Sequence, residues 1–503
     1  MAAVGGVAYE RRRPEKTLLY KLVQEHLLTF LATMEVAERA LPTYVVREFE
    51  RYLACGDLAR GFARVECSGC GYTRLVAFAC KSRSFCPSCL GRTMNETAAY
   101  LVDHVIGDVP VRHWVLSLPP PLRYLVAHDA ALCSAVLGAF VRSVTGFLRG
   151  QAKRELGLDA AALAQPGAVT VIQRASSHLA LNPHFHSIVT DGVYVREPAD
   201  GKLTFRALPA PSKADVANVA WQTCQRVCKL LRKRGLWLDA DPSEDPLAQR
   251  EPGLAACAAA SVQGVLLLGP RAGQRLMRLF GEAAHGERDV EASPEVQVPG
   301  YGFSVHAQTR ISAHDRQGRE RLCRYLTRPP LAQDRLHLLA SGHVRLGLKR
   351  PWSDGTTSVV FEPLDFLSKL AALVPPPRMH RTRYHGVWSS HAKARREVTS
   401  QCPAGAGTCP CGQGGTALKS ADEQAASHER KSKRYDWARL LARVFDVDVL
   451  SCTRCGAGRM QRVAFVTKPA IIRAMLSSVG LAADSPVPAP SRLGHQTDLF
   501  DVA

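Results

Sequence analysis

The sequence predicts an α+β protein, and three observations lead to this prediction. Apolar residues recur at helical spacing from Pro14 to about Leu53, whereas β-type runs separated by turn residues occupy the segment from Val169 to Val195. Between these regions lie two Cys-x-x-Cys pairs, the pattern of a small metal-binding module. Hydrophobic residues make up 46% of the 503 residues, which excludes wholesale disorder and a collagen-like chain.

The helices are predicted from apolar periodicity and from residues that stop a helix. The first region is expected to form two or three helices with a break at Leu41-Pro42. A helix-rich stretch is expected after the run of prolines at 119–121 and ends near Gly157. A basic helix is predicted over about 213–235 and a charged helix over about 315–328.

The strands are predicted from short alternating runs bounded by turn residues. Candidates are residues 73–78, 111–117 and 302–311, together with the runs between 169 and 195. Asp191-Gly192 separates two of these runs, and Asp-Gly in that position is a strong signal for a β-hairpin.

Composition divides the chain into four parts. Residues 399–434 are rich in Gly, Ala, Ser, Lys and Glu and poor in apolar residues, which predicts a flexible linker. Before it we expect a helical and zinc-binding N-terminal domain over 1–110 and a larger domain over 111–398 that carries the candidate catalytic residues. A small folded region over 435–503 follows it.

The charge balance indicates a polyanionic partner. Lys and Arg outnumber Asp and Glu by 65 to 45, so the formal net charge is +20. Such an excess suits nucleic acid or an acidic membrane surface. The apolar run Ala255–Leu268 is too short and too interrupted to span a bilayer, and no secretory signal is visible at the N-terminus. We therefore expect a cytoplasmic protein that binds nucleic acid and no membrane.

The cysteine-rich module predicts one structural zinc site. Cys67 and Cys70 form one pair and Cys86 and Cys89 form a second, and four thiolates complete the tetrahedral shell of a structural zinc ion. A closed shell leaves no open position for catalysis. Cys55 and Cys80 lie nearby in the sequence and could substitute as ligands, but core packing is the favoured interpretation for both.

A further pair, Cys452 and Cys455, is half of a zinc ribbon. Its missing half could come from Cys402, Cys409 or Cys411, but the spacing of these three is irregular. A second zinc site is therefore an alternative interpretation of this pair.

The segment around His184 and His186 predicts a divalent-metal site. Alternate residues of a strand share a face, so both imidazoles point the same way while Phe185 packs into the opposite layer. Two imidazoles on a rigid strand can hold a divalent cation with a third ligand from elsewhere, and His306 and Gln173 are the candidates. The alternative interpretation is a pair of structural histidines.

The charged helix carries one tyrosine, Tyr325, in a mostly basic stretch. Helical spacing places Arg321 and Arg328 near the face of that tyrosine, whereas the acidic Glu320 lies off it. A phenol surrounded by guanidinium groups can approach a phosphodiester and, beside a metal, could act as a nucleophile. The residues expected to contact DNA are Arg321, Arg324, Arg328, Lys81 and Arg83.

Taken together, these motifs resemble the HUH endonucleases, and among them the rolling-circle insertion-sequence transposases, the two-tyrosine family with an N-terminal zinc-binding domain. The resemblance rests on the cysteine module and on the segments 181–186, 325–332 and 384–387, and it covers roughly residues 15–395. It implies an antiparallel-sheet HUH domain with flanking helices, preceded by a helical and zinc-ribbon-like N-terminal domain. It also implies structural Zn²⁺, catalytic Mg²⁺ or Mn²⁺, and Tyr325 as the nucleophile.

The sequence departs from the founding members of that family at one position. Those members carry two tyrosines four residues apart, and here Arg321 stands four residues before Tyr325. The match is therefore closer to the single-tyrosine branch, the common-region elements. Tyr384 is a possible second nucleophile, but it lies outside the tyrosine helix and packing is favoured for it.

The resemblance implies a transposase that nicks and rejoins single-stranded DNA at insertion-sequence ends through a 5′-phosphotyrosine intermediate. Two alternatives stay open: a rolling-circle replication initiator with the same chemistry, and a non-catalytic zinc-ribbon DNA-binding protein. No Walker-A pattern is present in the sequence, which disfavours an ATP-driven motor.

Overall fold

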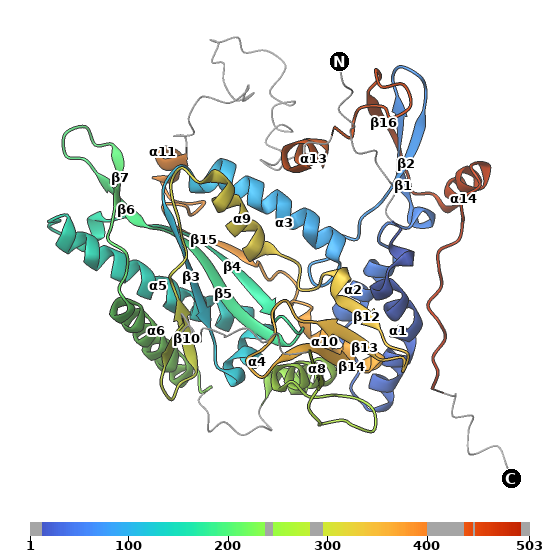
Figure 1. The fold of residues 1–503 in the computed structure, drawn as a ribbon, viewed down its shortest axis with the longest axis horizontal. Coiled ribbons are helices and arrows are strands. Elements are labelled where there is room, and N and C mark those ends of the chain that lie inside the picture. Colours follow the sequence, from blue (N-terminus) through green and yellow to red (C-terminus); the bar gives the residue numbers. More distant parts are fainter. Residues whose placement is uncertain (1–12, 237–244, 282–294, 400–436, 446–447, 494–503) are drawn as a thin grey trace.

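The computed structural model describes residues 13–236, 245–281, 295–399, 437–445 and 448–493 (Figure 1). Most of the predicted linker lies outside these residues. The described part combines helices with antiparallel sheets, which confirms the predicted α+β class.

The largest sheet in the described residues is antiparallel, and its strands run in the order β15-β4-β5-β3-β10-β9, with β11 also paired to β3. Its strands are β3 (Val111–Ser117), β4 (Gly167–Ala175), β5 (Leu181–Thr190), β9 (Val296–Val298), β10 (Phe303–His306), β11 (Arg310–Ile311) and β15 (Thr382–Gly386). The predicted strand over 111–117 is therefore present as β3, whereas the single strand predicted over 302–311 is divided into β10 and β11. β5 lies between β4 and β3, so both of its edges are paired.

Helices cover both faces of this sheet (Figure 1). On one face, α5 (Ala130–Glu155) and α6 (Lys213–Lys233) pack against Trp114 and Phe185. On the other face, α3 (Pro87–Leu101) and α9 (Arg316–Thr327) pack against Val169, Val171 and Ile188. Because β5 alternates, Phe185 enters the first layer while its neighbours His184 and His186 face the second layer.

One described helix, α5, is long and apolar enough to cross a membrane by length and composition. Half of its most apolar stretch is buried inside the fold, where residues such as Phe140 pack against the sheet. That burial is what a core helix of this length requires.

A second core joins the N-terminal helices to a smaller four-stranded sheet, in the order β12-β13-β14-β8. The helices are α1 (Leu18–Val36), α2 (Thr43–Leu53), α4 (Pro120–His128), α7 (Pro246–Arg250), α8 (Pro252–Gln263) and α10 (Pro363–Leu373). The strands are β8 (Met277–Phe280), β12 (Leu336–Leu338), β13 (Val344–Gly347) and β14 (Thr356–Phe361). The break between α1 and α2 includes the predicted Leu41-Pro42.

A three-stranded sheet joins the N-terminal region to the C-terminal region of the described chain. Its order is β16-β1-β2, formed by β1 (Phe62–Cys67), β2 (Thr73–Ala77) and β16 (Met460–Val466). The C-terminal region also supplies α13 (Trp437–Phe445) and α14 (Pro469–Ser478). In Figure 1 β16, from the C-terminal region of the sequence, lies beside β1 and β2, which come from the first 80 residues.

Shorter helical segments connect these parts. They are η1 (Pro14–Lys16), η2 (Leu58–Arg60), η3 (Val102–Ile106), η4 (Ala161–Leu163), η6 (Gln333–Arg335) and α11 (Arg395–Thr399).

The hairpin predicted at Asp191-Gly192 is wrong. β6 (Gly192–Arg196) pairs with β7 (Leu203–Ala207) in a separate two-stranded sheet, because β3 and β4 already occupy both edges of β5. The chain leaves the large sheet at Asp191, whose buried carboxylate accepts hydrogen bonds from Arg112 (2.7 Å) and Arg310 (2.6 Å). A side chain at Gly192 would collide with the Arg206 carbonyl, so a glycine is needed where β6 begins.

Candidate functional site

The two predicted histidines lie on the sheet face that α9 covers. Their ring centroids are 4.7 Å apart, and His186 is buried while His184 is partly buried. β5 carries both side chains on one face, as strand alternation predicts, and its pairing on both edges holds its backbone rigid.

A third histidine, His113 of β3, belongs to the same group. Its Nε2 lies 2.9 Å from Nδ1 of His186, and the two rings stack with centroids 5.1 Å apart. Sequence reasoning missed His113. The alternation of the predicted strand over 111–117 assigns it to a face, but only the pairing of β3 with β5 shows that this face carries His186.

The hydrogen bonds leave ring nitrogens available to a metal. Nδ1 of His184 donates to the Asn182 carbonyl at 2.6 Å, which leaves Nε2 of His184 as the nitrogen with the lone pair. Nε2 of His186 is buried and has no hydrogen-bond partner among the described residues. A buried polar atom without a partner is costly, and a cation ligated at that nitrogen would remove the cost.

Burial keeps these imidazoles neutral. It lowers the pKa of His184 to about 4 and that of His113 to about 3, and it lowers the pKa of His186 well below its usual value. Only a neutral imidazole has a free lone pair to give to a metal. Neutral imidazole nitrogens of this kind are potential ligands for a divalent cation, and they suit softer ions better than Mg²⁺, which prefers oxygen ligands.

The two candidates for a third ligand lie at different distances from β5. Gln173 of β4 is paired directly with His184, and its amide nitrogen donates to the backbone carbonyls of Tyr325 (3.1 Å) and Leu326 (2.7 Å). His306 of β10 is paired with Val115, so β3 separates it from His186. Gln173 is thus the nearer of the two.

The helix α9 brings Tyr325 over the histidines. The Tyr325 ring centroid lies 5.7 Å from that of His186 and 6.1 Å from that of His113, and both contacts are edge-to-face. The guanidinium of Arg328 lies 4.3 Å above the tyrosine ring, as helical spacing predicts. Tyr325 is 43% exposed, so a ligand can reach it from solvent.

The predicted DNA-contacting arginines on α9 differ in their surroundings. Arg321 is largely exposed and lies 4.0 Å from Asp315, at the limit of an ion pair. Arg324 pairs with Glu320 at 2.5 Å, and Glu320 also pairs with Arg443 of α13 at 2.8 Å. Arg324 is therefore held in an ion pair within the protein. Arg321 faces solvent, and Arg328 lies against the Tyr325 ring.

A cavity beside the C-terminal end of α9 is strongly cationic. Its charged lining residues are Arg83, Arg174, Arg328, Arg335, Lys349 and Arg381, and Gln173 also lines it. Burial and the nearby Arg328 and Arg335 lower the pKa of Lys349 to about 8. The structure thus brings Arg83 of the N-terminal region to the same cavity as Arg328, whereas Lys81 is exposed outside that lining.

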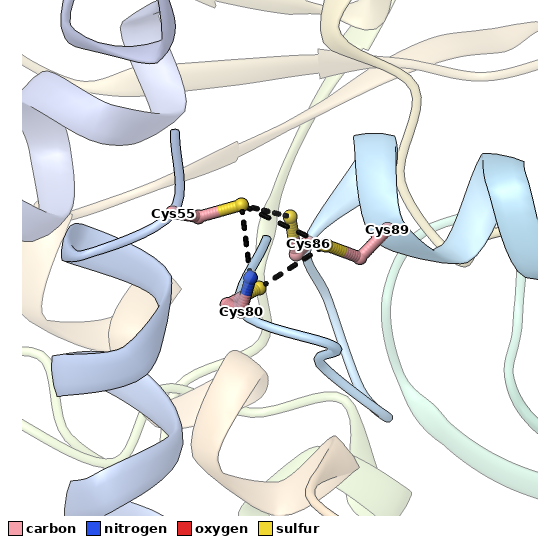
Figure 2. Close-up of side chains that lie close together, drawn as sticks. All are labelled: Cys55, Cys80, Cys86 and Cys89. Carbon is pink, nitrogen blue, oxygen red and sulfur yellow. Dashed lines mark hydrogen bonds between the residues drawn. The ribbon is translucent and has the colours of Figure 1, made fainter. Parts of the chain in front are cut away.

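The four cysteines predicted to share one zinc ion are divided between two clusters. Cys86 and Cys89 meet Cys55 and Cys80, with sulfur–sulfur distances of 3.4 to 3.8 Å, and Figure 2 shows all four side chains converging. Cys55 and Cys80, predicted as core cysteines, complete this first cluster. Hydrogen bonding from the other three thiols lowers the pKa of Cys55.

The other predicted pair joins the C-terminal pair. Cys67 lies 3.6 Å from Cys455 and Cys70 lies 3.8 Å from Cys452, measured between the sulfur atoms. The three cysteines suggested as partners of Cys452 and Cys455, which are Cys402, Cys409 and Cys411, lie outside the described residues. Backbone N–H groups that point at the sulfur lower the pKa of Cys455 to about 6.

The length of the β1–β2 hairpin explains why the predicted grouping fails. Cys67 and Cys70 lie at its tip, whereas Cys80 and Cys86 follow its base, just before α3. A hairpin strand of six residues is about 20 Å long, far more than a tetrahedral metal shell can span. Spacing in the sequence could not show which way the hairpin points.

Tyr384, the other candidate nucleophile, is partly buried and packs against a hydrophobic core. It lies on β15 opposite Val169, among the apolar residues between the sheet and α3, with the Arg395 guanidinium 5.4 Å from its ring. This position agrees with the packing interpretation.

These features define a DNA-processing class of protein, with a cysteine-rich region, three neighbouring histidines and a tyrosine whose ring lies beneath the Arg328 guanidinium. Two family models match the chain. Residues 167–396 match the model Y2_Tnp, described as "Putative transposase", and residues 22–118 match the model Zn_Tnp_IS91, described as "Transposase zinc-binding domain". The chain is therefore a transposase of the IS91 type, with structural zinc in its N-terminal region and DNA as its substrate.

No curated protein and no solved structure matches the chain. The first cysteine cluster falls wholly within the match to the zinc-binding domain, whereas Cys452 and Cys455 fall outside both family matches.

Proposed function

We propose that this transposase nicks and rejoins single-stranded DNA at the ends of an insertion sequence through a 5′-phosphotyrosine intermediate, as HUH endonucleases do. The observation that carries the proposal is the edge-to-face contact of Tyr325 with His186 and His113, beneath the Arg328 guanidinium. A tyrosine held there lies beside a nitrogen-donor metal site and a cation that can bind phosphate.

The histidines supply the metal site of the proposal. His184 and His186 would hold a divalent cation through their Nε2 atoms, and Gln173 is the better placed third ligand because it is paired with His184. When bound, such a cation draws electron density from a non-bridging phosphate oxygen and makes the phosphorus more electrophilic. His113 orients the His186 ring through the bond between Nε2 and Nδ1.

Tyr325 is the proposed nucleophile. Its Oη attacks the phosphorus and loses its proton to solvent. The bond from phosphorus to the 3′ oxygen breaks, and that oxygen takes a proton from solvent and leaves as a 3′ hydroxyl. The tyrosine then carries the 5′ phosphate as an ester. Attack by a 3′ hydroxyl reverses the step, so rejoining needs no ATP because the ester retains the energy of the broken bond.

The cationic cavity supports a single-stranded substrate. Arg328 belongs both to the tyrosine contact and to the cavity, so a strand whose phosphates lie along Arg83, Arg335 and Lys349 would pass Tyr325. With a net charge of +20, affinity for DNA should fall steeply as salt rises, because neutralised phosphates release counterions.

The first experiment tests the nucleophile. Tyr325→Phe keeps the aromatic ring and its packing but removes the attacking oxygen, so it should abolish the covalent adduct with a single-stranded oligonucleotide of the element end. Binding of the same oligonucleotide should stay within about twofold. Tyr301→Phe is a matched control, because Tyr301 is 42% exposed and lies elsewhere in the fold. Adduct formation by Tyr325→Phe would reject the assignment and point to Tyr384.

The second experiment tests the metal site. EDTA should stop cleavage, and Mn²⁺ should restore it at least as well as Mg²⁺ because imidazole is a softer ligand than water or carboxylate. His184→Ala and His186→Ala should each lose cleavage but keep DNA binding, because arginine and lysine side chains supply most of the affinity for DNA. If activity in these variants only follows the folded fraction, the histidines are structural.

Two other functions compete with this proposal. A replication initiator would use the same adduct, and the DNA flanking the gene separates it from a transposase by showing either element ends or a replication origin. A non-catalytic zinc-ribbon binder would form no adduct with any oligonucleotide. A cytoplasmic location, where the chain meets chromosomal DNA, fits both DNA-processing functions.

A further inference from the structure

We propose that Cys67, Cys70, Cys452 and Cys455 bind a second structural zinc ion, which joins the C-terminal segment to the N-terminal β1–β2 hairpin. The four sulfur atoms lie within 4.8 Å of one another. The two pairs are separated by more than 380 residues in the chain. Neither family match includes the C-terminal pair, so the site extends beyond the zinc-binding domain that the family defines.

The two pairs form matching metal-binding turns. Each has the sequence Cys-x-x-Cys-Gly, and the glycines Gly71 and Gly456 have φ angles of +71° and +69°. In each turn the N–H of that glycine donates to the carbonyl of the first cysteine, at 3.0 Å for Cys67 and 2.9 Å for Cys452. The pair Cys86 and Cys89 differs, because it lies at the start of α3 and is followed by Leu90.

The sulfur geometry fits tetrahedral zinc. With zinc–sulfur bonds of about 2.3 Å, the sulfur atoms of a tetrahedral site lie about 3.8 Å apart. The measured distances of 3.6 and 3.8 Å agree with that value and are too long for disulfide bonds of about 2.05 Å. Backbone N–H groups also point at the sulfurs, from Gly69 to Cys67 (3.4 Å) and from Gly458 to Cys455 (3.3 Å). Such bonds stabilise thiolates.

Backbone pairing holds the two turns against each other. β16 pairs with β1 along its length, and Cys67 is opposite Met460 in the register. The Ser68 N–H donates to the Arg459 carbonyl at 3.0 Å. A Cβ atom on Gly458 would lie 2.3 Å from the Cys67 sulfur, so a glycine is required at the point where the two turns meet.

The inferred ion would also support the surroundings of Tyr325. The same C-terminal segment carries Arg443, which pairs with Asp103 at 3.0 Å and with Glu320 of α9 at 2.8 Å. Zinc bound by Cys67, Cys70, Cys452 and Cys455 would hold the C-terminal segment against the β1–β2 hairpin and so help to keep Arg443 beside Glu320. The β1–β2 hairpin and the C-terminal segment that carries β16 would then act as one module.

Zinc counting on the full-length protein tests the site. The wild type should carry two zinc ions per chain, one for each cluster. Cys67→Ala/Cys70→Ala and Cys452→Ala/Cys455→Ala should each carry one, and the variant that combines all four changes should also carry one, because both pairs hold the same ion. Two zinc ions in Cys452→Ala/Cys455→Ala, or none in the combined variant, would overturn the proposal.

Two matched controls accompany the zinc counts. Cys224→Ala/Cys228→Ala removes a cysteine pair on α6 whose sulfur atoms are 3.9 Å apart. Among the described residues this pair belongs to neither four-cysteine cluster, so the variant should keep both zinc ions. Cys402→Ala/Cys409→Ala/Cys411→Ala should also keep both ions. Loss of one ion in the triple variant would assign Cys452 and Cys455 to those cysteines and reject the shared site.

Thiol labelling of the wild type tests the same site without substitutions that could disturb folding. As zinc is withdrawn with increasing chelator, N-ethylmaleimide should modify Cys67, Cys70, Cys452 and Cys455 together, with one common rate read by mass spectrometry. The buried cluster should become labelled separately. Labelling of Cys452 and Cys455 while Cys67 and Cys70 stay protected would show that they do not share an ion.

Discussion

The two cysteine clusters have the same ligands but opposite surroundings. Cys55, Cys86 and Cys89 are buried among aromatic side chains of the N-terminal core, including Phe85 and Tyr52. The second cluster, the ribbon cluster, consists of Cys67, Cys70, Cys452 and Cys455. Cys70 and Cys455 are exposed, and the other two cysteines pack in a small apolar group that includes Met460. One cluster is part of a core, and the other closes a surface sheet.

This difference predicts different consequences of metal loss. Buried thiolates without a cation carry uncompensated charge in an apolar environment, so the core around them cannot stay folded unless they protonate. Exposed thiols can be hydrated, so the ribbon can lose its ion and open locally. The buried cluster should therefore control global stability, whereas the ribbon cluster should control only the attachment of the C-terminal segment.

The largest effect is expected from the buried cluster. Cys86→Ala/Cys89→Ala should unfold the N-terminal core, because structural zinc contributes about 10–16 kcal/mol and a whole domain is stable by only about 5–15 kcal/mol. Circular dichroism during thermal unfolding measures the loss. Cys452→Ala/Cys455→Ala is the comparison variant and should keep the main transition within a few degrees. Equal loss of structure in both variants would contradict the distinction between core and surface.

An intermediate effect is expected from the glycines of the ribbon. Gly458→Ala places a methyl group against the Cys67 sulfur and should weaken the ribbon zinc by roughly 3 kcal/mol, about a hundredfold in affinity. Gly456→Ala meets nothing within 4 Å but is strained by its positive φ, which costs about 1 kcal/mol. Competition with a chromophoric chelator measures both, and equal affinities would show that the turns do not meet as closely as described.

The smallest effect is the change in stability with pH that the histidine site, unlike the two cysteine clusters, owes to His184. Burial lowers the pKa of His184 from 6.5 to about 4, so the unfolded chain binds a proton in this range while the folded chain does not. Stability should therefore fall as pH drops from 6.5 to 4, by roughly 2 kcal/mol for this histidine. Urea unfolding gives the free energy of unfolding of zinc-loaded wild type and zinc-loaded His184→Gln at each pH. Because both proteins contain the same cysteines, the difference between the two free energies does not depend on the protonation of the thiolates. Parallel curves for the two proteins would contradict the lowered pKa.

Local features of the fold and the site could be predicted from the sequence because they depend on short-range backbone geometry. Strand alternation places His184 and His186 on one face with Phe185 on the other, and helical spacing places Arg328 over Tyr325. The strand over Val111–Ser117 and the break at Leu41-Pro42 follow from equally local signals. The turns at Cys67–Gly71 and Cys452–Gly456 share the local sequence Cys-x-x-Cys-Gly, and this shared pattern is a sequence signal that could have predicted that they form one site.

The tertiary structure decided which of these local elements meet. β3 pairs with β5, which brings His113 to His186 and occupies the edge that a hairpin at Asp191-Gly192 would have needed. The length and direction of the β1–β2 hairpin carry Cys67 away from Cys86 and toward Cys455. Such choices depend on long-range strand pairing and on the surface that it buries, so no spacing within a short segment of sequence contains them.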